Sequence, residues 1–148
     1  MYDPKNAELV FELQQQLADY WYEVDTNGGL DAHNYYTDDA VFHGPKSSYE
    51  GKEKIRQFYK WRIDNGPRLA MHSITNFRAW FTGADTAESS CYMLLYAADG
   101  VKVLPSAPPI AIVLLTDKYK RVGDRWLCTY RRFEHWFEGG APVTNPKL

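Results

Sequence analysis

The sequence predicts an α+β fold, in which N-terminal helices are followed by a curved, mainly antiparallel sheet. Two observations indicate this class. Up to about residue 65, apolar residues recur at helical spacing, and beyond it long β-branched and aromatic runs are divided by turn residues. Helices set apart from an antiparallel meander are typical of α+β proteins. A long, twisted sheet can curl around the first helix and enclose a conical pocket.

The first element is a helix from about Asn6 to Asp25. Its apolar stripe is Leu9, Val10, Leu13, Leu17, Tyr20, Trp21 and Val24. The segment Thr26-Asn27-Gly28-Gly29 ends this helix, because glycine readily adopts the left-handed conformation of a C-terminal cap. Three short elements are then expected: a helix over Leu30–Tyr36, a turn at Asp38-Asp39, and a strand over Ala40–His43 that pairs with Ser48–Glu50.

A third helix is predicted over Lys52–Asn65, where Gly66-Pro67 ends it. Four long strands follow: Leu69–Phe81, Thr86–Ala97, Ile110–Val122 and Trp126–Phe137. Val122-Gly123-Asp124-Arg125 reads as a hairpin turn. The 99–109 segment is a loop of the length that often forms a functional lid. The sequence contains no repeat and no linker, so we expect residues 1–148 to form one domain.

The composition excludes some classes of protein. Five Trp, eleven Tyr and seven Phe make up 16% of the chain, and aromatics suit both core walls and ligand cavities. The net charge is −2 with scattered basic residues, so no nucleic-acid partner is expected. The N-terminus does not read as a signal peptide and no apolar run reaches membrane-spanning length, so we expect a cytoplasmic protein without a membrane partner.

Neither the cysteines nor the histidines indicate a metal site. Cys91 and Cys128 lack metal-ligand spacing and are expected to be ordinary buried thiols. The four histidines have no carboxylates nearby at ligand spacing. We therefore predict no metal and no organic cofactor.

The candidate chemistry lies in a pair that is distant in sequence, Asp25 and His72. Asp25 lies about 100° around the first helix from Val24, where its carboxylate could point inward. A carboxylate at a helix C-terminus opposes the helix dipole, which indicates another reason for its presence. A carboxylate that orients an imidazole can support proton abstraction without a metal. The alternatives are a solvated acid in the turn and a core histidine bonded to a backbone carbonyl.

Other residues are candidates for binding or charge stabilisation. Because side chains alternate along a strand, His72, Ile74 and Asn76 should share one face. Arg131 and Arg132 should face opposite sides, so that one of them could hold an oxyanion or carboxylate, or else form an ion pair at a subunit contact. Tyr20 is a candidate phenol donor. The expected substrate contacts are Asn76, Trp21, His43 at the pocket mouth, and Tyr96.

Several motifs occur together in a fixed order along nearly the whole chain. They are Tyr22-Glu23-Val24-Asp25, Tyr36-Thr37-Asp38-Asp39-Ala40-Val41-Phe42, Gly51-Lys52-Glu53, His72-Ser73-Ile74-Thr75-Asn76, Thr116-Asp117-Lys118-Tyr119 and Gly123-Asp124-Arg125-Trp126. In this the chain resembles the NTF2-like superfamily. It is most similar to the SnoaL-like branch, which includes scytalone dehydratase, hexachlorocyclohexane dehydrochlorinase and bile-acid 7α-dehydratase. The resemblance implies a cone-shaped fold with an internal pocket.

The resemblance also implies roles for four residues. His72 would be the base, Asp25 its orienting carboxylate, and Arg131 the last-strand arginine of the dehydrochlorinase. Tyr20 stands where that enzyme has a lysine, which argues against loss of a halide and suits departure of a hydroxyl or polarisation of a carbonyl.

Three functions follow as expectations. The first is a cofactor-independent lyase, a dehydratase of a hydrophobic cyclic or polycyclic carbonyl or hydroxyl compound. The second is an isomerase or polyketide-type cyclase with the same pair, and the third a non-catalytic binding module or oxygenase-subunit-like assembly module. Aromatic side chains on an outer sheet face indicate a homodimer or homotrimer: Trp80, Phe133 and Trp136.

Overall fold

The computed structural model describes residues 2–139. Two α-helices, α1 (Ala7–Asn27) and α2 (Lys52–Asp64), are accompanied by short 3₁₀ turns at Pro4–Asn6 and Ala32–Tyr35. Six strands complete the fold: β1 (Tyr36–His43), β2 (Ser48–Glu50), β3 (Arg68–Phe81), β4 (Thr86–Asp99), β5 (Ala111–Val122) and β6 (Arg125–Glu138).

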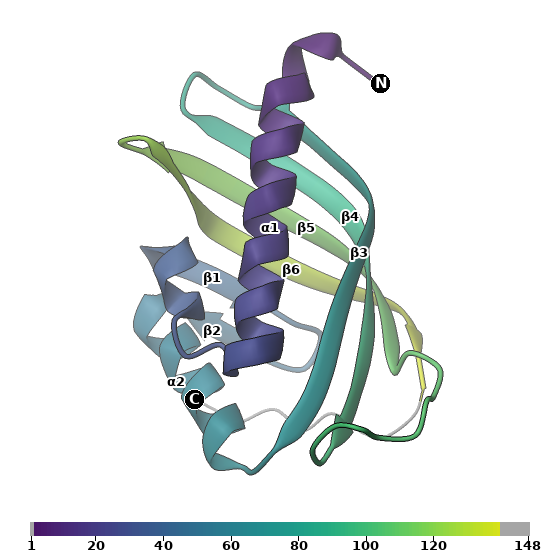
Figure 1. The fold of residues 1–148 in the computed structure, drawn as a ribbon. Coiled ribbons are helices and arrows are strands. Elements are labelled where there is room, and N and C mark those ends of the chain that lie inside the picture. Colours follow the sequence, from purple (N-terminus) through teal and green to yellow (C-terminus); the bar gives the residue numbers. More distant parts are fainter. Residues whose placement is uncertain (1, 140–148) are drawn as a thin grey trace.

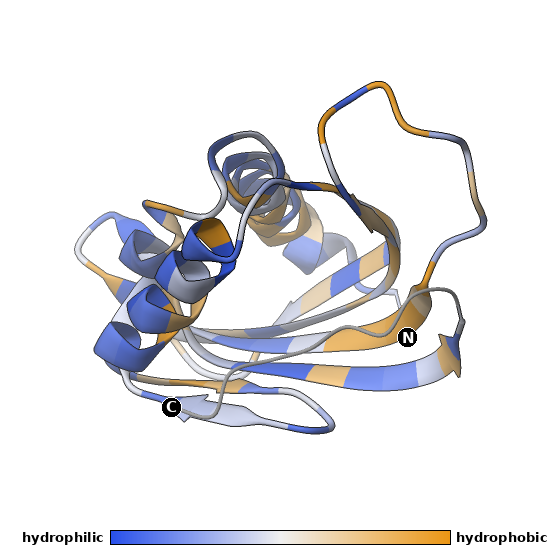
Figure 2. Ribbon diagram, turned by 90° about the horizontal axis from the view of Figure 1, so that it is seen from below, coloured by the Kyte–Doolittle hydropathy of each residue, from blue (hydrophilic) through white to orange (hydrophobic). Residues whose placement is uncertain are grey.

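The strands form one curved sheet with the order β2-β1-β6-β5-β4-β3. All neighbours pair antiparallel except β1 and β6, which run parallel. The long helix α1 lies across the concave face (Figure 1). Viewed from below, both helices lie on the same side of the sheet, and the β4–β5 loop extends away from them (Figure 2). The expected α+β class with a cone-like sheet is thus confirmed.

The segment between the helices differs from the prediction. Only Ala32–Tyr35 is helical, as a 3₁₀ turn, and Asp38 and Asp39 lie inside strand β1 rather than in a turn. Tyr36 and Ala40 are completely buried, and β1 pairs with β6 through Tyr36↔Cys128 and Val41↔Tyr130. This tertiary pairing overrides the local turn preference of two consecutive aspartates, whose side chains remain exposed.

The C-terminal end of α1 is fixed against α2. Gly28 caps α1 in the left-handed conformation with φ 69°, as its sequence context predicted. A Cβ at Gly29 would lie 2.4 Å from the ring of Tyr59, so α2 packs directly on this turn. The last turn of α1, which carries Asp25, is therefore held in one position.

The core lies between α1 and the concave face of the sheet. Leu9, Leu13 and Leu17 of α1 are at most 2% exposed and pack against sheet residues that include Val113 and Leu115. The side chain of Phe133 joins this core, which corrects its placement on an outer aromatic face. Trp136 does lie outside, at 53% exposure. The packed α1 stripe leaves the wider end of the cone unfilled.

Candidate active site

A cavity of about 1000 Å³ occupies the open end of the cone, between the two helices and the sheet. Its apolar walls include Trp21, Phe42, Phe58, Met93, Leu95 and Phe133. This volume is at the upper end of the range for small-molecule sites and is large enough for a polycyclic compound. Of the β4–β5 loop, only its last residue, Ile110, lines the cavity within the described chain.

Asp25 and His72 meet at the wall of this cavity. Asp25 Oδ1 lies 2.6 Å from His72 Nδ1, and Asp25 Oδ2 accepts a 2.9 Å hydrogen bond from the His72 backbone N–H. Their side chains are 17% and 12% exposed. The pairing expected from the sequence is therefore formed, between the last turn of α1 and strand β3.

This geometry sets the tautomer of His72. An ionised carboxylate only accepts hydrogen bonds, so Nδ1 of His72 carries the proton toward Asp25. In the neutral ring, Nε2 then has a free lone pair, which is what a general base requires. Trp21 holds the ring from one side, with centroids 4.1 Å apart and planes 7° from parallel. His72 and Trp21 both line the cavity.

Burial lowers the pKa of His72 below its ordinary value, and the hydrogen bond and charge of Asp25 only partly reverse that change. The positive charges of Arg68 and Arg62 lower the pKa of His72 further. The environment of His72 therefore favours the neutral imidazole. A neutral imidazole is the form that can accept a proton.

The Arg131 side chain is paired with another buried residue and is not open to a ligand. Its guanidinium makes two 2.8 Å bonds with Asp117, and the two side chains are 3% and 1% exposed. Tyr119 donates a further 2.8 Å hydrogen bond to Asp117. Burial opposes the charge of Arg131, but Asp117 and the nearby phenols outweigh it, so its pKa stays well above the ordinary value. The Arg131 side chain does not line the cavity.

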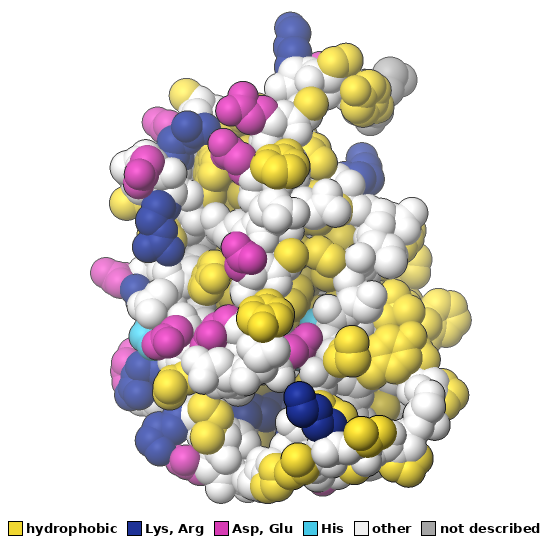
Figure 3. All heavy atoms as spheres, in the orientation of Figure 1, with side chains coloured by type: hydrophobic (Ala, Val, Ile, Leu, Met, Phe, Trp, Pro, Cys, Tyr) yellow, Lys and Arg dark blue, Asp and Glu magenta, His cyan; other side chains and the backbone are white. Residues whose placement is uncertain are grey.

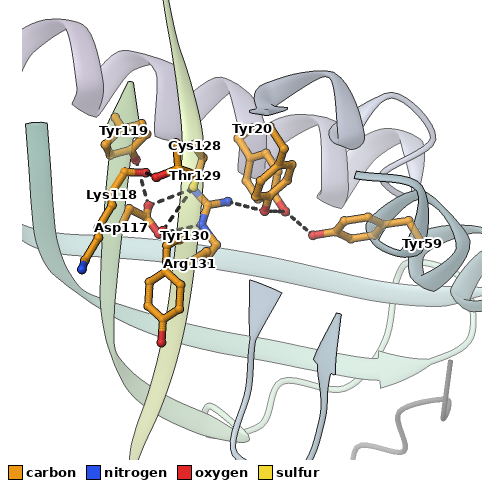
Figure 4. A network of polar contacts seen from close by, with 10 residues as sticks. Tyr20, Tyr59, Asp117, Lys118, Tyr119, Cys128, Thr129, Tyr130 and Arg131 are labelled. Carbon is orange, nitrogen blue, oxygen red and sulfur yellow. Dashed lines mark hydrogen bonds and ion pairs between the residues drawn. The ribbon is translucent and has the colours of Figure 1, made fainter. Parts of the chain in front are cut away.

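A chain of hydrogen-bonded phenols runs from Arg131 to Tyr59 (Figure 4). Arg131 donates to the Tyr36 hydroxyl at 3.0 Å, and Tyr36 donates to the Tyr20 hydroxyl at 2.6 Å. Tyr20 is in turn hydrogen-bonded to Tyr59. Either hydroxyl can be the donor in the contact between Tyr20 and Tyr59; when Tyr20 donates, the Tyr59 proton is left for another acceptor. Burial is the main cause that raises the pKa of Tyr59.

The chain of phenols changes two expectations. Tyr20 is 1% exposed and Arg131 is 2% exposed, so neither reaches a ligand directly. Tyr59, which does line the cavity, was missed because its place on the apolar side of α2 is equally typical of a core residue. The only sequence feature that could have pointed to Tyr59 was the presence of a phenol among the apolar residues on that side of the helix.

Three of the expected substrate contacts lie away from the cavity lining. Asn76 has φ 54° at an irregularity between Thr75 and Arg78, which breaks the alternation and leaves Asn76 exposed; its expected face was wrong. Tyr96 neighbours Leu95, which faces inward, so its own side chain points outward and is 39% exposed. His43 is exposed and stacks on Tyr130.

Two arginines that line the cavity were also missed. Arg62 is on α2, and Arg68 begins β3 on the same face as His72. Isolated arginines near a helix end and a strand start belong to no motif, so no sequence pattern selects them.

The described residues include no group of three or more His, Cys, Asp or Glu side chains placed to hold a metal. Cys91 and Cys128 are free, buried thiols, as predicted, and burial raises the pKa of Cys91 to about 12. Among the described helices, none is long and apolar enough to cross a membrane.

Comparison with known proteins defines the class. The model of the SnoaL-like domain family matches residues 6–132, so this chain belongs to that family, as its motifs indicated. The family includes dehydratases and cyclases. No curated protein matches the sequence.

Solved structures with this fold share little sequence with the chain. A proposed scytalone dehydratase of Novosphingobium aromaticivorans is 16% identical, with a TM-score of 0.77 over 95% of this chain and 92% of that chain. ActVI-ORFA of Streptomyces coelicolor is 14% identical, with a TM-score of 0.75 over 86% and 98%. A Catenulispora acidiphila protein in complex with S-DNPA is 23% identical, with a TM-score of 0.72 over 87% and 94%. These likenesses support the NTF2-like fold.

Proposed function

We propose that this protein is a cofactor-independent lyase, a dehydratase that removes water from a hydrophobic cyclic or polycyclic hydroxy-carbonyl compound. The observation that carries the proposal is the contact between Asp25 and His72 at the wall of a large apolar cavity. It supplies a neutral base, a fixed tautomer and space for a bulky ring system.

The reaction balances without an added reagent. His72 Nε2 takes a proton from the carbon next to the substrate carbonyl, and the C–H electrons move to form an enolate. When the carbon–oxygen bond to the β-hydroxyl breaks, these electrons form the new C=C bond. The proton on His72 passes to the departing oxygen, so the products are the unsaturated carbonyl compound and water. Asp25 stabilises the transient imidazolium.

The developing enolate needs a hydrogen-bond donor, and we assign this role to Tyr59. Its side chain lines the cavity, and its proton can point to a ligand when Tyr20 donates in their mutual hydrogen bond. Tyr20 and Arg131 then act as positioning residues behind it. Donors that are fixed in advance and aligned toward one acceptor stabilise developing charge efficiently.

An isomerase or cyclase is the second candidate, because the same base and donor form the same enolate. A library of cyclic β-hydroxyketones separates the two by mass spectrometry. Dehydration gives a product lighter by one water, whereas isomerisation leaves the mass unchanged.

The test on any substrate so identified is His72→Asn. We expect the turnover number to fall about 10²- to 10⁴-fold. His43→Asn, at an exposed histidine outside the cavity lining, is the matched control and should leave turnover unchanged. Full turnover by His72→Asn, or ligand binding without any reaction in the wild type, would overturn the proposal and favour a binding module.

A further inference from the structure

The cavity has apolar walls but is also lined by cationic side chains. Arg68 and Arg62 both line it, as does Lys46. In Figure 3, Lys and Arg side chains lie near the lower end of α1, in the lower part of this face. A neutral ligand would make no use of the positive charge of Arg68.

Arg68 is the informative member of this group. Within residues 2–139, Arg68 has no ion pair within 4.0 Å and no side-chain hydrogen bond. Burial lowers the pKa of Arg68, which shows that its charged form is partly desolvated. Asp99 lies opposite it in the β3–β4 ladder and interacts with it electrostatically, but Asp99 is exposed and outside the cavity lining. A partly desolvated guanidinium without a close carboxylate costs free energy, which a ligand anion would offset.

Acidic groups elsewhere at the cavity do not occupy this position. Glu138 lines the cavity but pairs with His135, with Oε1 2.8 Å from Nδ1. Asp25 is bound to His72. Among the described residues, neither of these carboxylates neutralises Arg68.

The spacing along β3 fixes where an anion would lie relative to the base. Arg68, Ala70 and His72 all line the cavity from one face of the strand. Four residues of strand separate the Arg68 and His72 Cα atoms by about 13 Å. A fused two- or three-ring system is no longer than this Cα separation.

We infer that the ligand of this cavity is an aromatic or alicyclic carboxylic acid, whose carboxylate binds Arg68 while its opposite end meets His72. The inference deepens the proposed function by naming an acidic substrate class, and it rests on that function only for the reaction at His72. Binding of the carboxylate is a separate property that can be measured without turnover.

The probes are a matched pair, 2-naphthoate and the uncharged 2-naphthamide. Each competes with the neutral fluorescent reporter N-phenyl-1-naphthylamine for the apolar cavity. A change in the NMR chemical shifts of the His72 ring on addition of the competitor places the competitor in this cavity. We expect the wild type to bind naphthoate about tenfold more tightly than naphthamide, as one charge-assisted hydrogen bond allows.

Arg68→Gln should abolish this preference while the affinities for naphthamide and the reporter stay unchanged, which also shows that the variant folds. Arg68→Lys should retain part of the preference. Arg78→Gln, at an exposed arginine of the same strand, is the matched control and should behave as the wild type.

Equal binding of the two probes by the wild type would overturn the inference, and so would a preference that persists in Arg68→Gln. These outcomes are independent of the proposed reaction. If His72→Asn keeps full turnover while naphthoate is still preferred through Arg68, the acid–base proposal fails and the carboxylate site stands. If His72→Asn is inactive and the wild type does not prefer naphthoate, the acid–base proposal stands and the carboxylate site fails.

Discussion

Asp25 binds one residue, His72, twice: its Oδ2 accepts the backbone N–H at 2.9 Å and its Oδ1 lies 2.6 Å from Nδ1. The backbone contact fixes the carboxylate relative to strand β3, and the second contact orients the ring. Rotation of the Asp25 side chain away from the ring would also disturb its contact with the backbone N–H. The imidazole is therefore held in place before any substrate arrives, as preorganised catalysis requires.

Protein stability should depend on His72 at mildly acidic pH. Because burial lowers the pKa of His72 in the folded state, the unfolded chain binds more protons between that value and about 6.5. Stability should thus fall as the pH drops below about 6.5. Urea unfolding at several pH values measures this effect.

His72→Gln should show a shallower loss of unfolding free energy over the same pH interval. Parallel pH curves for the wild type and this variant would show that His72 titrates normally in the folded protein.

The buried ion pair of Arg131 and Asp117 should be essential for stability. Asp117→Asn leaves a guanidinium buried without its counter-charge, which we expect to cost about 3–5 kcal/mol of unfolding free energy. Arg132→Gln breaks an exposed pair with Glu134 on the same strand and should cost less than about 1 kcal/mol. Chemical denaturation compares the two, and similar costs would contradict the structural role of the buried pair.

Tyr59→Phe tests the donor assigned to the enolate. The change removes the hydroxyl of a residue that lines the cavity but keeps the ring, so the turnover number should fall by at least tenfold with little change in KM. Tyr22→Phe, at a phenol that is 70% exposed on α1, is the control. An unchanged turnover number in Tyr59→Phe would remove this residue from the mechanism.

Hydrophobic side chains on the outer face of the sheet support the expected homodimer or homotrimer. Met71, Tyr92, Trp136 and Phe137 are between 38% and 65% exposed, and hydrophobic atoms gather over β3 and β4 in Figure 3. Light scattering should give a multiple of the monomer mass, and Trp136→Glu should reduce it. Phe11→Glu, at a side chain of α1 that is 67% exposed, should leave the measured mass unchanged. A monomeric wild type at micromolar concentration would refute this expectation.

The sequence was most informative where periodicity is long and one face is buried. The α1 stripe and the four long strands were located closely because each repeats a burial pattern many times. The short region before α2 was harder, since β1 depends on pairing with β6, a partner about 90 residues away. Asp25 and His72 were found through motifs, whereas Asn76 was misplaced because a β-irregularity cannot be read from alternation.

Which phenol and which arginine face the cavity could not be derived from local sequence. Tyr20 and Tyr59 both lie on apolar helix faces, and only the packing of α1 on α2 decides which of them lines the cavity. Similarly, Arg131 is directed to Asp117 by the register of β5 and β6, in which the two residues are direct partners.

The most direct test of the central claim is an NMR titration of the His72 ring in the wild type and in Asp25→Asn. It needs no substrate. We expect a His72 pKa below 6.5 in the wild type, and a lower value in Asp25→Asn, because the variant loses the negative charge that favours the imidazolium. The same His72 pKa in both proteins would contradict a coupled acid–base pair.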